Sequence, residues 1–415
     1  MMLSSPEERR RQRHEKAKQR AKERKKLFIR LGAAGAVLIF CLALILSLRP
    51  KKPDSPPEQT VLSTSEATQA VDPTATVIHY AAAGDLNINE TTVAAGGTTY
   101  NYTDAFLDVA HLLADADIAS INFEGNLCGE PYGSSFSAPN TMAAALQKAG
   151  VDLVQMANSY SINRGISGLQ SSIDAVRSAG MEPVGVYASN AEFNQNKGYT
   201  IRTVKGVKLA FVAFTKGMDG MALPPGSEKC VNVLYTDYDS SYQTIDRERI
   251  TSILSAVKKE KPDIVIALLH WGSEFNNTIS KSQTEITTLL QANGVDAIIG
   301  THSHYVQKMS FDGETGQFVA YSLGDFFSNA QRAGSEYSVI LDLEITKPAD
   351  GKARITGYSY TPIFTVHEEN QPLKVVRIDQ AIAAYEGNYL QKVSQQTYDK
   401  MRYALERIEA RIHAE

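Results

Sequence analysis

The sequence predicts a mixed α/β (α+β) protein, in which a two-sheet β-sandwich is flanked by helices and preceded by one transmembrane helix. Several runs of Val, Ile, Leu and Ala have the length of a strand and end in polar residues, as strands buried on both faces of a sheet do. Segments with helical spacing separate some of these runs, whereas short turns join others into antiparallel pairs. One apolar stretch near the N-terminus is long enough to span a bilayer.

The N-terminal region predicts a membrane anchor. Residues 1–26 are rich in Arg and Lys, and residues 27–48 form the apolar stretch. The positive-inside rule then predicts a cytoplasmic basic tail at 1–26, a single transmembrane helix (a signal anchor) at 27–48, and a body outside the plasma membrane. Residues 49–76 are rich in Pro, Ser and Thr, which is typical of an extended extracellular linker. A cleaved signal peptide is the alternative, but no small-residue cleavage site follows the apolar stretch.

Charge is divided unevenly along the chain. Residues 1–52 hold 15 of the 42 Lys and Arg residues and 4 of the 46 Asp and Glu residues. The remainder therefore carries 27 basic and 42 acidic groups, a net charge of −15. An acidic body argues against binding to nucleic acid, because contacts with phosphates dominate that affinity. Two of the three cysteines, Cys128 and Cys230, lie in the body, and their separation in sequence leaves open whether they pair.

The first half of the body alternates strands with helices, as β-α-β units do. The first strand covers residues 77–84 and ends at Asp85. Further strands are predicted at 117–123, 151–157 and 182–186, and helices at 103–114, 139–149 and 169–179. Gly180 follows the last of these helices, in the position of a C-terminal capping glycine.

The second half adds antiparallel pairs to the alternating pattern. Hairpins are predicted where Lys205-Gly206 and the turn DGETG separate apolar runs. The other predicted elements are helices at 242–260 and 282–292 and strands at 201–204, 207–214, 264–270, 306–311, 317–323, 338–345 and 353–360, with a further strand in the run DAIIGT. The main domain is placed at 77–367. A C-terminal helical flank follows at 368–415, in which residues 385–414 are predicted to form one long helix against the body.

Polar residues gather where the predicted strands end. They are Asp85, Glu124, Asn158, His270, His302, His304 and Asp325. In open α/β sheets, ligands collect beyond the carboxyl ends of the strands. Carboxylates and imidazoles are together the ligands of divalent transition metals, and alternate residues of the His-x-His pair can reach one site. The sequence therefore predicts a metal site at one edge of the sheet.

These residues lie in motifs that resemble the capsule-synthesis (poly-γ-glutamate, CapA-like) family, which has a calcineurin-like metallophosphoesterase fold. The matching text is GD at 84–85, N-x-E at 122–124, HWGSE at 270–274, GTHSH at 300–304 and YSLGDF at 321–326. The resemblance implies a CapA-like domain at 77–367 that acts in capsule or poly-γ-glutamate biosynthesis or export. It implies divalent metal, Mn or Zn, held by Asp85, Glu124, His270, His302 and His304.

One motif departs from the family pattern. The family reads ANNH-x-x-D-x-G after the third strand, whereas this chain reads ANSYSINRG at 157–165. Ser159 stands in place of an Asn ligand and Tyr160 in place of a His, and a tyrosine seldom acts as a histidine does near neutral pH. His270 and Tyr160 are the candidate catalytic residues. The remaining predicted pocket residues are Asn87, Asn158, Ser159, Trp271, Glu274 and Asp325.

Two classes of function follow from this pattern. The first is an exported metal-dependent hydrolase anchored in the membrane, which attacks a phosphoester or an amide. The second is a non-catalytic scaffold with a degenerate metallophosphoesterase site, which binds an anionic polymer such as poly-γ-glutamate or a synthase complex. A phosphodiesterase unrelated to capsule is a further alternative within the enzymes. Metal content and activity on a simple phosphodiester distinguish these hypotheses.

Overall fold

The computed structural model describes residues 74–330, 332–390 and 392–414, which belong to one compact unit. The predicted basic tail, the predicted transmembrane helix at 27–48 and nearly all of the predicted linker lie outside these residues. Within the described ranges, no helix combines the length and apolar character that a membrane span needs. Cys128 and Cys230 are both free thiols.

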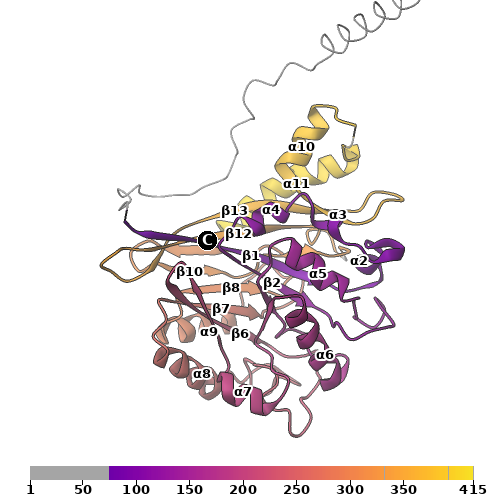
Figure 1. Ribbon diagram of the computed structural model, residues 1–415. Coiled ribbons are helices and arrows are strands. Elements are labelled where there is room, and N and C mark those ends of the chain that lie inside the picture. The colour runs from indigo at the N-terminus through magenta and orange to yellow at the C-terminus, as the bar shows by residue number, and fades with distance from the viewer. Residues whose placement is uncertain (1–73, 331, 391, 415) are drawn as a thin grey trace, which may run out of the picture. The chain divides into compact units, whose positions relative to one another are not determined.

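An eight-stranded sheet forms one layer of the body (Figure 1). Its order is β14 (Lys374–Arg377), β13 (Arg354–Val366), β12 (Tyr337–Lys347), β1 (Thr76–Asn87), β2 (Ile118–Glu124), β3 (Leu153–Gln155) and β4 (Glu182–Val184). The short strand β11 (Asp325–Phe327) pairs in parallel with the end of β1. Strands β1 to β4 are parallel to one another, whereas β12, β13 and β14 pair antiparallel.

A six-stranded sheet forms the second layer. Its order is β5 (Thr200–Val204), β6 (Val207–Thr215), β7 (Ile264–His270), β8 (Ala297–Thr301), β10 (Gln317–Ala320) and β9 (Met309–Asp312). Strands β6, β7, β8 and β10 are parallel, and the antiparallel hairpins with β5 and β9 close the two edges. Strand β7 is buried along its whole length, as its continuous apolar run predicts.

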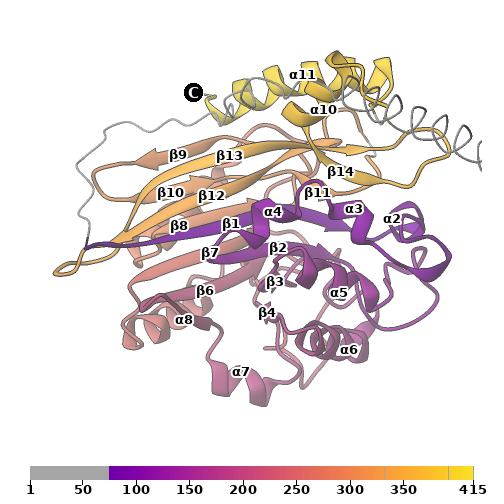
Figure 2. The ribbon, with the colours of Figure 1, turned by 45° about the horizontal axis from the view of Figure 1, so that its top comes forward.

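Helices cover the outer sides of the two sheets (Figure 2). Helices α8 (Arg247–Lys259) and α9 (Lys281–Ala292) pack on the second sheet. Helices α5 (Thr141–Lys148) and α6 (Gly165–Ser178) lie beside β2 to β4. Helices α10 (Ile378–Glu386) and α11 (Gln395–Ile412) lie over β12 to β14. The short helices are α2 (Glu90–Ala94), α3 (Thr103–Phe106), α4 (Ala110–Ala114), α7 (Asn190–Asn196) and the 3₁₀ turn Gly97–Thr99. The predicted arrangement of two sheets flanked by helices is confirmed.

Two hydrophobic cores hold these layers together. The larger core joins the two sheets, where Tyr80 of β1 meets Phe211 of β6 with their ring centroids 5.6 Å apart, and it continues under α6 and α11. The smaller core lies between the second sheet and helices α8 and α9, and it contains Trp271. This packing fixes the relative position of the strand ends that carry the site.

Some predicted elements differ in the structure. The helix predicted at 103–114 is two short helices, α3 and α4. The helix predicted at 242–260 begins at Arg247, because the side chain of Asp246 caps it by accepting a hydrogen bond from the Arg249 amide. The helix predicted at 385–414 is wrong: α10 ends before Asn388, whose φ of +54° is left-handed, and α11 begins at Gln395. The C-terminal flank also contributes strand β14 to the sheet.

Candidate metal centre

The parallel strands of both sheets end at the same edge of the sandwich, and the predicted residues meet there. Asp85 lies near the end of β1, Glu124 is the last residue of β2, and His270 is the last residue of β7. His302 follows β8, whose final residue Thr301 pairs with His270. Parallel pairing places residues that are distant in sequence side by side, so the site draws on both sheets.

Two glycines allow a close approach that positions the two aspartates. A Cβ atom on Gly84 would lie 1.8 Å from the carbonyl oxygen of Gly324, so no side chain fits there. Gly324 itself has φ of +80°. The Asp85 amide donates a hydrogen bond to the Gly324 carbonyl over 3.0 Å, and Asp85 pairs with Asp325 in the register of β1 and β11.

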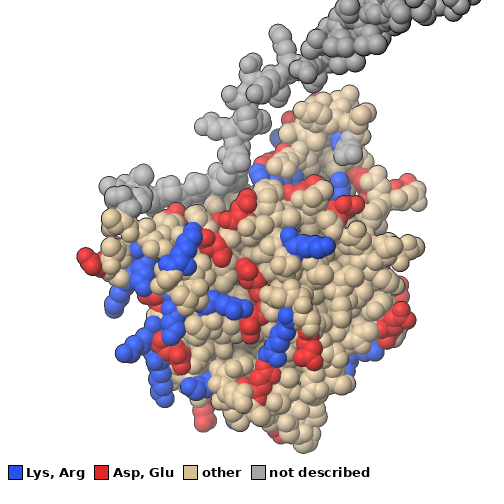
Figure 3. Space-filling view, viewed as in Figure 1, with Lys and Arg blue, Asp and Glu red and all other residues tan. Residues whose placement is uncertain are grey.

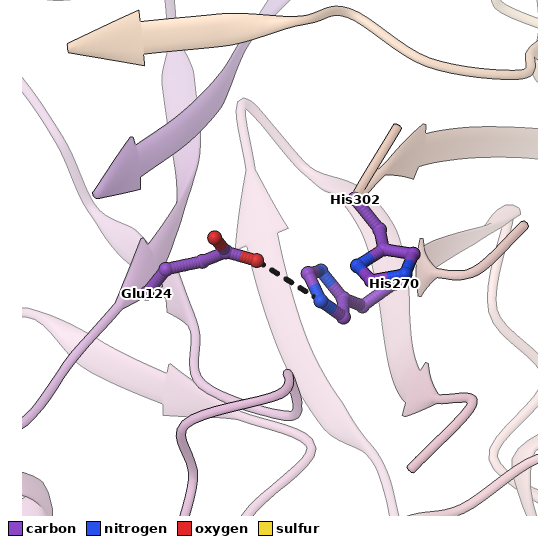
Figure 4. A group of neighbouring side chains, drawn as sticks. All are labelled: Glu124, His270 and His302. Carbon is purple, nitrogen blue, oxygen red and sulfur yellow. Dashed lines mark ion pairs between the residues drawn. The ribbon is translucent and has the colours of Figure 1, made fainter. Parts of the chain in front are cut away.

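The first ligand group consists of Glu124, His270 and His302, all of them buried (Figure 4). Glu124 Oε1 lies 2.9 Å from His270 Nε2, and the ring centroids of the two histidines are 4.4 Å apart. His270 Nδ1 lies 3.2 Å from the Thr301 hydroxyl, which fixes the orientation of the ring. One ligand atom from each of the three residues lies within 4.8 Å of the others.

The second ligand group consists of Asp85, His304 and Asp325, and its ligand atoms also lie within 4.8 Å of one another. His304 Nδ1 lies 2.8 Å from Asp325 Oδ1, and its Nε2 lies 3.8 Å from Glu274 Oε1. The five residues predicted as metal ligands therefore fall into two groups, and Asp325, predicted as a pocket residue, joins one of them.

Hydrogen bonds connect the two groups. Asp85 Oδ2 accepts from the His302 amide over 2.9 Å, and Asp85 Oδ1 accepts from Asn122 Nδ2 over 2.6 Å. Asn122 Oδ1 in turn accepts from Asn158 Nδ2 over 3.1 Å. His302 has φ of +87°, a left-handed conformation that is costly for a non-glycine residue and is typical of functional sites.

Burial changes the protonation of the site. Burial raises the pKa of Asp85 to about 7, and the neighbouring Glu124 adds to the shift. Burial raises the pKa of Glu124 to about 8, against the opposing charge of His304. Burial lowers the pKa of His270 to about 3, despite the opposing charge of Asp85. The contact between Glu124 and His270 is therefore one between uncharged groups at neutral pH rather than an ion pair.

His304 is the exception among the buried histidines. Burial alone would lower its pKa, but the Asp325 carboxylate, assisted by Glu274 and Glu124, outweighs burial and raises the pKa to about 12. Burial lowers the pKa of His302 well below the usual value, and His270 adds to that shift. The second group thus holds a positive charge beside its carboxylates, whereas the first group holds none.

The two groups have the chemistry of a divalent metal site. Each combines carboxylate oxygen with imidazole nitrogen, the donor set of Mn²⁺ and Zn²⁺. Glu124 Oε1 is buried and, despite its proximity to His270, lacks the geometry of a hydrogen bond with any described residue. A buried oxygen without a partner costs free energy, and a cation between Glu124, His270 and His302 would satisfy it.

The loop after β3 carries the residues that differ from the family pattern, and it places them at the same site. The Ser159 hydroxyl lies 3.1 Å from His270 Nε2, so serine contacts the first group directly. Asn158 donates to Asn122 and to the Phe123 carbonyl, which makes it a positioning residue. Tyr160 stacks on Phe136 with ring centroids 4.4 Å apart, and burial raises the pKa of its hydroxyl to about 12. Tyr160 therefore keeps its proton at neutral pH.

A cavity of about 140 Å³ opens beside the second group. Five predicted residues line it: Asn87, Tyr160, Glu274, His304 and Asp325. Trp271, predicted as a pocket residue, does not. Its side chain is fully buried in the smaller core, its ring stacks on Tyr321, and its Nε1 donates to the Tyr321 carbonyl over 2.9 Å. The apolar area of the indole is the physical reason for this placement.

Sequence reasoning did not single out Lys216 or the bridging role of Asn122. Lys216 Nζ donates to the Gly272 carbonyl over 3.0 Å and lies 3.2 Å from His302 Nε2, and burial lowers its pKa. Lys216 directly follows β6, so its position at a strand end was an available signal. Asn122 lies within the N-x-E motif but two residues before the end of β2, where its amide reaches Asp85.

Comparison with known proteins gives a consistent set of relatives. The family described as bacterial capsule synthesis protein PGA_cap matches residues 79–330. A capsule biosynthesis protein CapA of Bacillus anthracis is 28% identical over 242 residues, which are 55% of this chain and 54% of that protein. A PGA biosynthesis protein CapA of Bacillus subtilis (strain 168) is 24% identical over 215 residues, 51% of each chain. This chain thus spans about half the length of these relatives.

Solved structures give weaker similarities. A structure described as a novel phosphatase, from Mycoplasma pneumoniae, has a TM-score of 0.44 and 13% identity over 70% of this chain and 94% of that one. A hypothetical protein from Thermus thermophilus has a TM-score of 0.40 and 15% identity over 69% of this chain and 98% of that one. At TM-scores this low, neither similarity identifies the fold family.

Proposed function

The chain belongs to the bacterial capsule synthesis protein family, and on that premise we propose that it acts in capsule or poly-γ-glutamate biosynthesis through a divalent metal centre. The proposal includes a metallophosphoesterase-like fold and anchoring by residues 27–48 in the plasma membrane, with the body outside the cell. The residues of the two ligand groups are spread over 241 residues of the chain, from Asp85 to Asp325. Their convergence in two adjacent buried groups is the observation that carries the proposal.

The residues of the site have distinct roles in this proposal. Glu124, His270 and His302 would hold one cation, and Asp85, His304 and Asp325 a second. Such a cation supplies Lewis-acid polarisation of a phosphoryl or carbonyl oxygen. Asn122 orients the Asp85 carboxylate, and Asp325 fixes the ring of His304 through its Nδ1. Tyr160 keeps its proton and lines the adjacent cavity, where it can donate a hydrogen bond to a bound group.

Metal content tests the centre. The purified full-length chain is stripped with a chelator, supplied with Mn²⁺ or Zn²⁺, and analysed for bound metal after removal of the excess. We expect stoichiometric metal in the wild type and a loss of at least half of it in Glu124→Gln, which keeps the shape of the side chain but cannot ionise when a cation binds. The matched control is Glu314→Gln, since Glu314 is exposed in a turn outside both ligand groups. A wild-type protein that retains neither metal would overturn this part of the proposal.

A non-catalytic scaffold is the second candidate function, and two contacts favour it. Ser159, a poor metal ligand, contacts His270, and the Lys216 ammonium contacts His302 Nε2, where it competes with a cation for the nitrogen. The double variant His302→Ala with His304→Ala separates the candidates. A metal-dependent role predicts loss of capsule or polymer output at normal protein level, whereas a scaffold role predicts unchanged output.

A further inference from the structure

The cavity beside the second ligand group has two aromatic walls. Phe136 and Tyr160 stack with their ring centroids 4.4 Å apart, and Phe275 stacks on His304 at 4.9 Å. All four residues line the cavity of about 140 Å³, which has the volume of roughly four or five water molecules. Flat aromatic faces favour a planar group between or against them. The walls therefore suit a small planar unit rather than a tetrahedral one.

A buried hydroxyl in the lining lacks a partner. The Ser328 side chain is only 3% exposed, and its Oγ makes no hydrogen bond with any described residue. Asn87 and Tyr160 also line the cavity, so the lining residues include both hydrogen-bond donors and acceptors. Burying a hydroxyl without a partner costs free energy, which a ligand that bonds to Ser328 would recover. The lining thus matches a ligand that both donates and accepts.

The charge of the lining disfavours anions. The described lining residues include the carboxylates of Glu274 and Asp325 and contain neither Lys nor Arg. The two ring nitrogens of His304 already lie 2.8 Å from Asp325 and 3.8 Å from Glu274. Arg332 lies over the Phe275 ring at 4.5 Å but does not line the cavity. In the metal-free protein, a phosphate or a carboxylate would therefore meet two carboxylates, with no Lys or Arg among the described lining residues to compensate.

We propose that this cavity binds one uncharged secondary amide, the linking unit of a peptide-like chain, next to the Asp85, His304 and Asp325 group. A secondary amide is planar, donates one hydrogen bond and accepts others, and carries no charge. The identification of the biological ligand as an amide of the capsule polymer rests on the proposed function, but the affinity for amides does not. In a polyglutamate chain, the amide would enter the cavity while the side-group carboxylates remain in solvent.

A pair of small fluorinated probes of similar size tests the ligand class. N-methyltrifluoroacetamide is an uncharged secondary amide, and trifluoroacetate is the corresponding anion. The full-length chain is kept free of metal with a chelator, and the ¹⁹F line width of each probe is measured as protein is added. We expect concentration-dependent broadening of the amide probe and little or none of trifluoroacetate. Equal or stronger broadening of trifluoroacetate would overturn the proposal.

Two serine variants locate the binding. Ser328→Ala removes the unpaired hydroxyl of a lining residue, and we expect about fivefold weaker amide binding, the effect of one neutral hydrogen bond. Ser338→Ala is the matched control, because Ser338 also has a buried hydroxyl without a described partner but does not line the cavity. Equal effects of the two variants would contradict the assignment. Should either variant unfold, the comparison of amide with anion on the wild type still decides the ligand class.

The result of the amide-binding experiment does not depend on the proposed function. Loss of capsule output in metal-ligand variants tests the biological role, whereas amide binding is measured on purified, metal-free protein. A protein that binds the amide but plays no part in capsule synthesis would keep this inference and overturn the other. A protein that acts in capsule synthesis but leaves the ¹⁹F lines of both probes unchanged would keep the proposed function and overturn this inference.

Discussion

At the scale of single residues, the site combines groups that burial holds uncharged. Glu124 and His270 are in contact at 2.9 Å, yet burial raises the pKa of the acid and lowers that of the base. An acid and a base in contact usually exchange a proton. Here desolvation opposes that transfer, because it would create two buried charges. A cation supplies the charge that would let Glu124 ionise, so metal binding and proton release are linked.

This linkage predicts how the stability of the metal-free protein depends on pH. The folded pKa values of Asp85 and Glu124, about 7 and about 8, lie above the usual carboxyl values. The folded state therefore keeps protons that the unfolded chain has already lost, and stability falls as pH rises from about 4 toward 8. His270 and His302 act in the opposite direction only below about pH 6.5, because their folded pKa values are lowered. Between about pH 6.5 and about pH 8 the two carboxyls act in the same direction as His304, whose raised pKa also removes stability as pH rises.

We expect the free energy of unfolding of the metal-free chain to decrease over this window by on the order of 1–2 kcal/mol. Thermal unfolding in the presence of a chelator measures it. Glu124→Gln imitates the protonated acid and should flatten the decrease, whereas the exposed control Glu314→Gln should not. Added Mn²⁺ or Zn²⁺ should reverse the trend in the wild type, because metal binds the ionised form. If the stability of the metal-free protein rose over this pH window, Asp85 and Glu124 would not be protonated in the folded state as we infer.

Individual residue roles were predictable only in part. The strand ends and motifs indicated Asp85, Glu124 and the histidines, because polar groups after buried strands are visible in the sequence. The division into two groups was not predictable, since it depends on the direction that each side chain takes after β8 and at the start of β11. Trp271 was misplaced because neighbours in the HWGSE motif point in opposite directions, and burial of the indole decided its side.

At the scale of elements, strands were predicted better than the connections between helices. Buried strands such as β1 and β7 carry continuous apolar runs that hardly depend on context. The C-terminal region does depend on its structural context. Strand β14 is only four residues long, and it is a strand because the edge of β13 is free to pair with it. Residues 387–394 separate helices α10 and α11; Asn388 takes a left-handed φ there, and the Ser394 side chain caps the start of α11.

Helix α11 also supports the site from behind, which gives a prediction at this scale. The Arg411 guanidinium packs against Tyr305 at 4.7 Å and Tyr337 at 5.2 Å, and Tyr305 directly follows His304. Arg411→Ala removes both contacts, and we expect a loss of about 1–3 kcal/mol in the free energy of unfolding. Chemical denaturation measures it.

Arg407 is the matched control for Arg411. It lies one helical turn earlier and contacts the ring of Tyr403, which is 58% exposed. Arg407→Ala should change the free energy of unfolding by no more than about 0.5 kcal/mol. Equal destabilisation by the two variants would mean that α11 contributes through general helix packing rather than through the contact behind His304.

At the scale of the whole molecule, charge constrains how the chain meets an anionic polymer. Beyond residue 52 the net charge is −15. On the face seen in Figure 3, Lys and Arg are interspersed with Asp and Glu, and the basic residues are most frequent on the left of the view. A polyglutamate chain is itself acidic, so long-range electrostatics oppose the encounter. The proposed amide cavity and the proposed divalent cations remain as the sources of attraction.

The dependence of polymer binding on salt follows from this charge. Raising the salt concentration from about 0.01 M to about 0.1 M shortens the Debye length from about 30 Å to about 10 Å. For a basic polyanion-binding protein, such a change weakens binding, because the attraction is screened. For this acidic body it screens repulsion, so we expect association of the full-length chain with purified poly-γ-glutamate to become stronger or stay unchanged. Mn²⁺ or Zn²⁺ should strengthen it further at constant ionic strength, with Mg²⁺ as the control ion. Binding that weakens steeply with salt would instead indicate a basic groove, and the site at the sheet edge would then not be where the polymer binds.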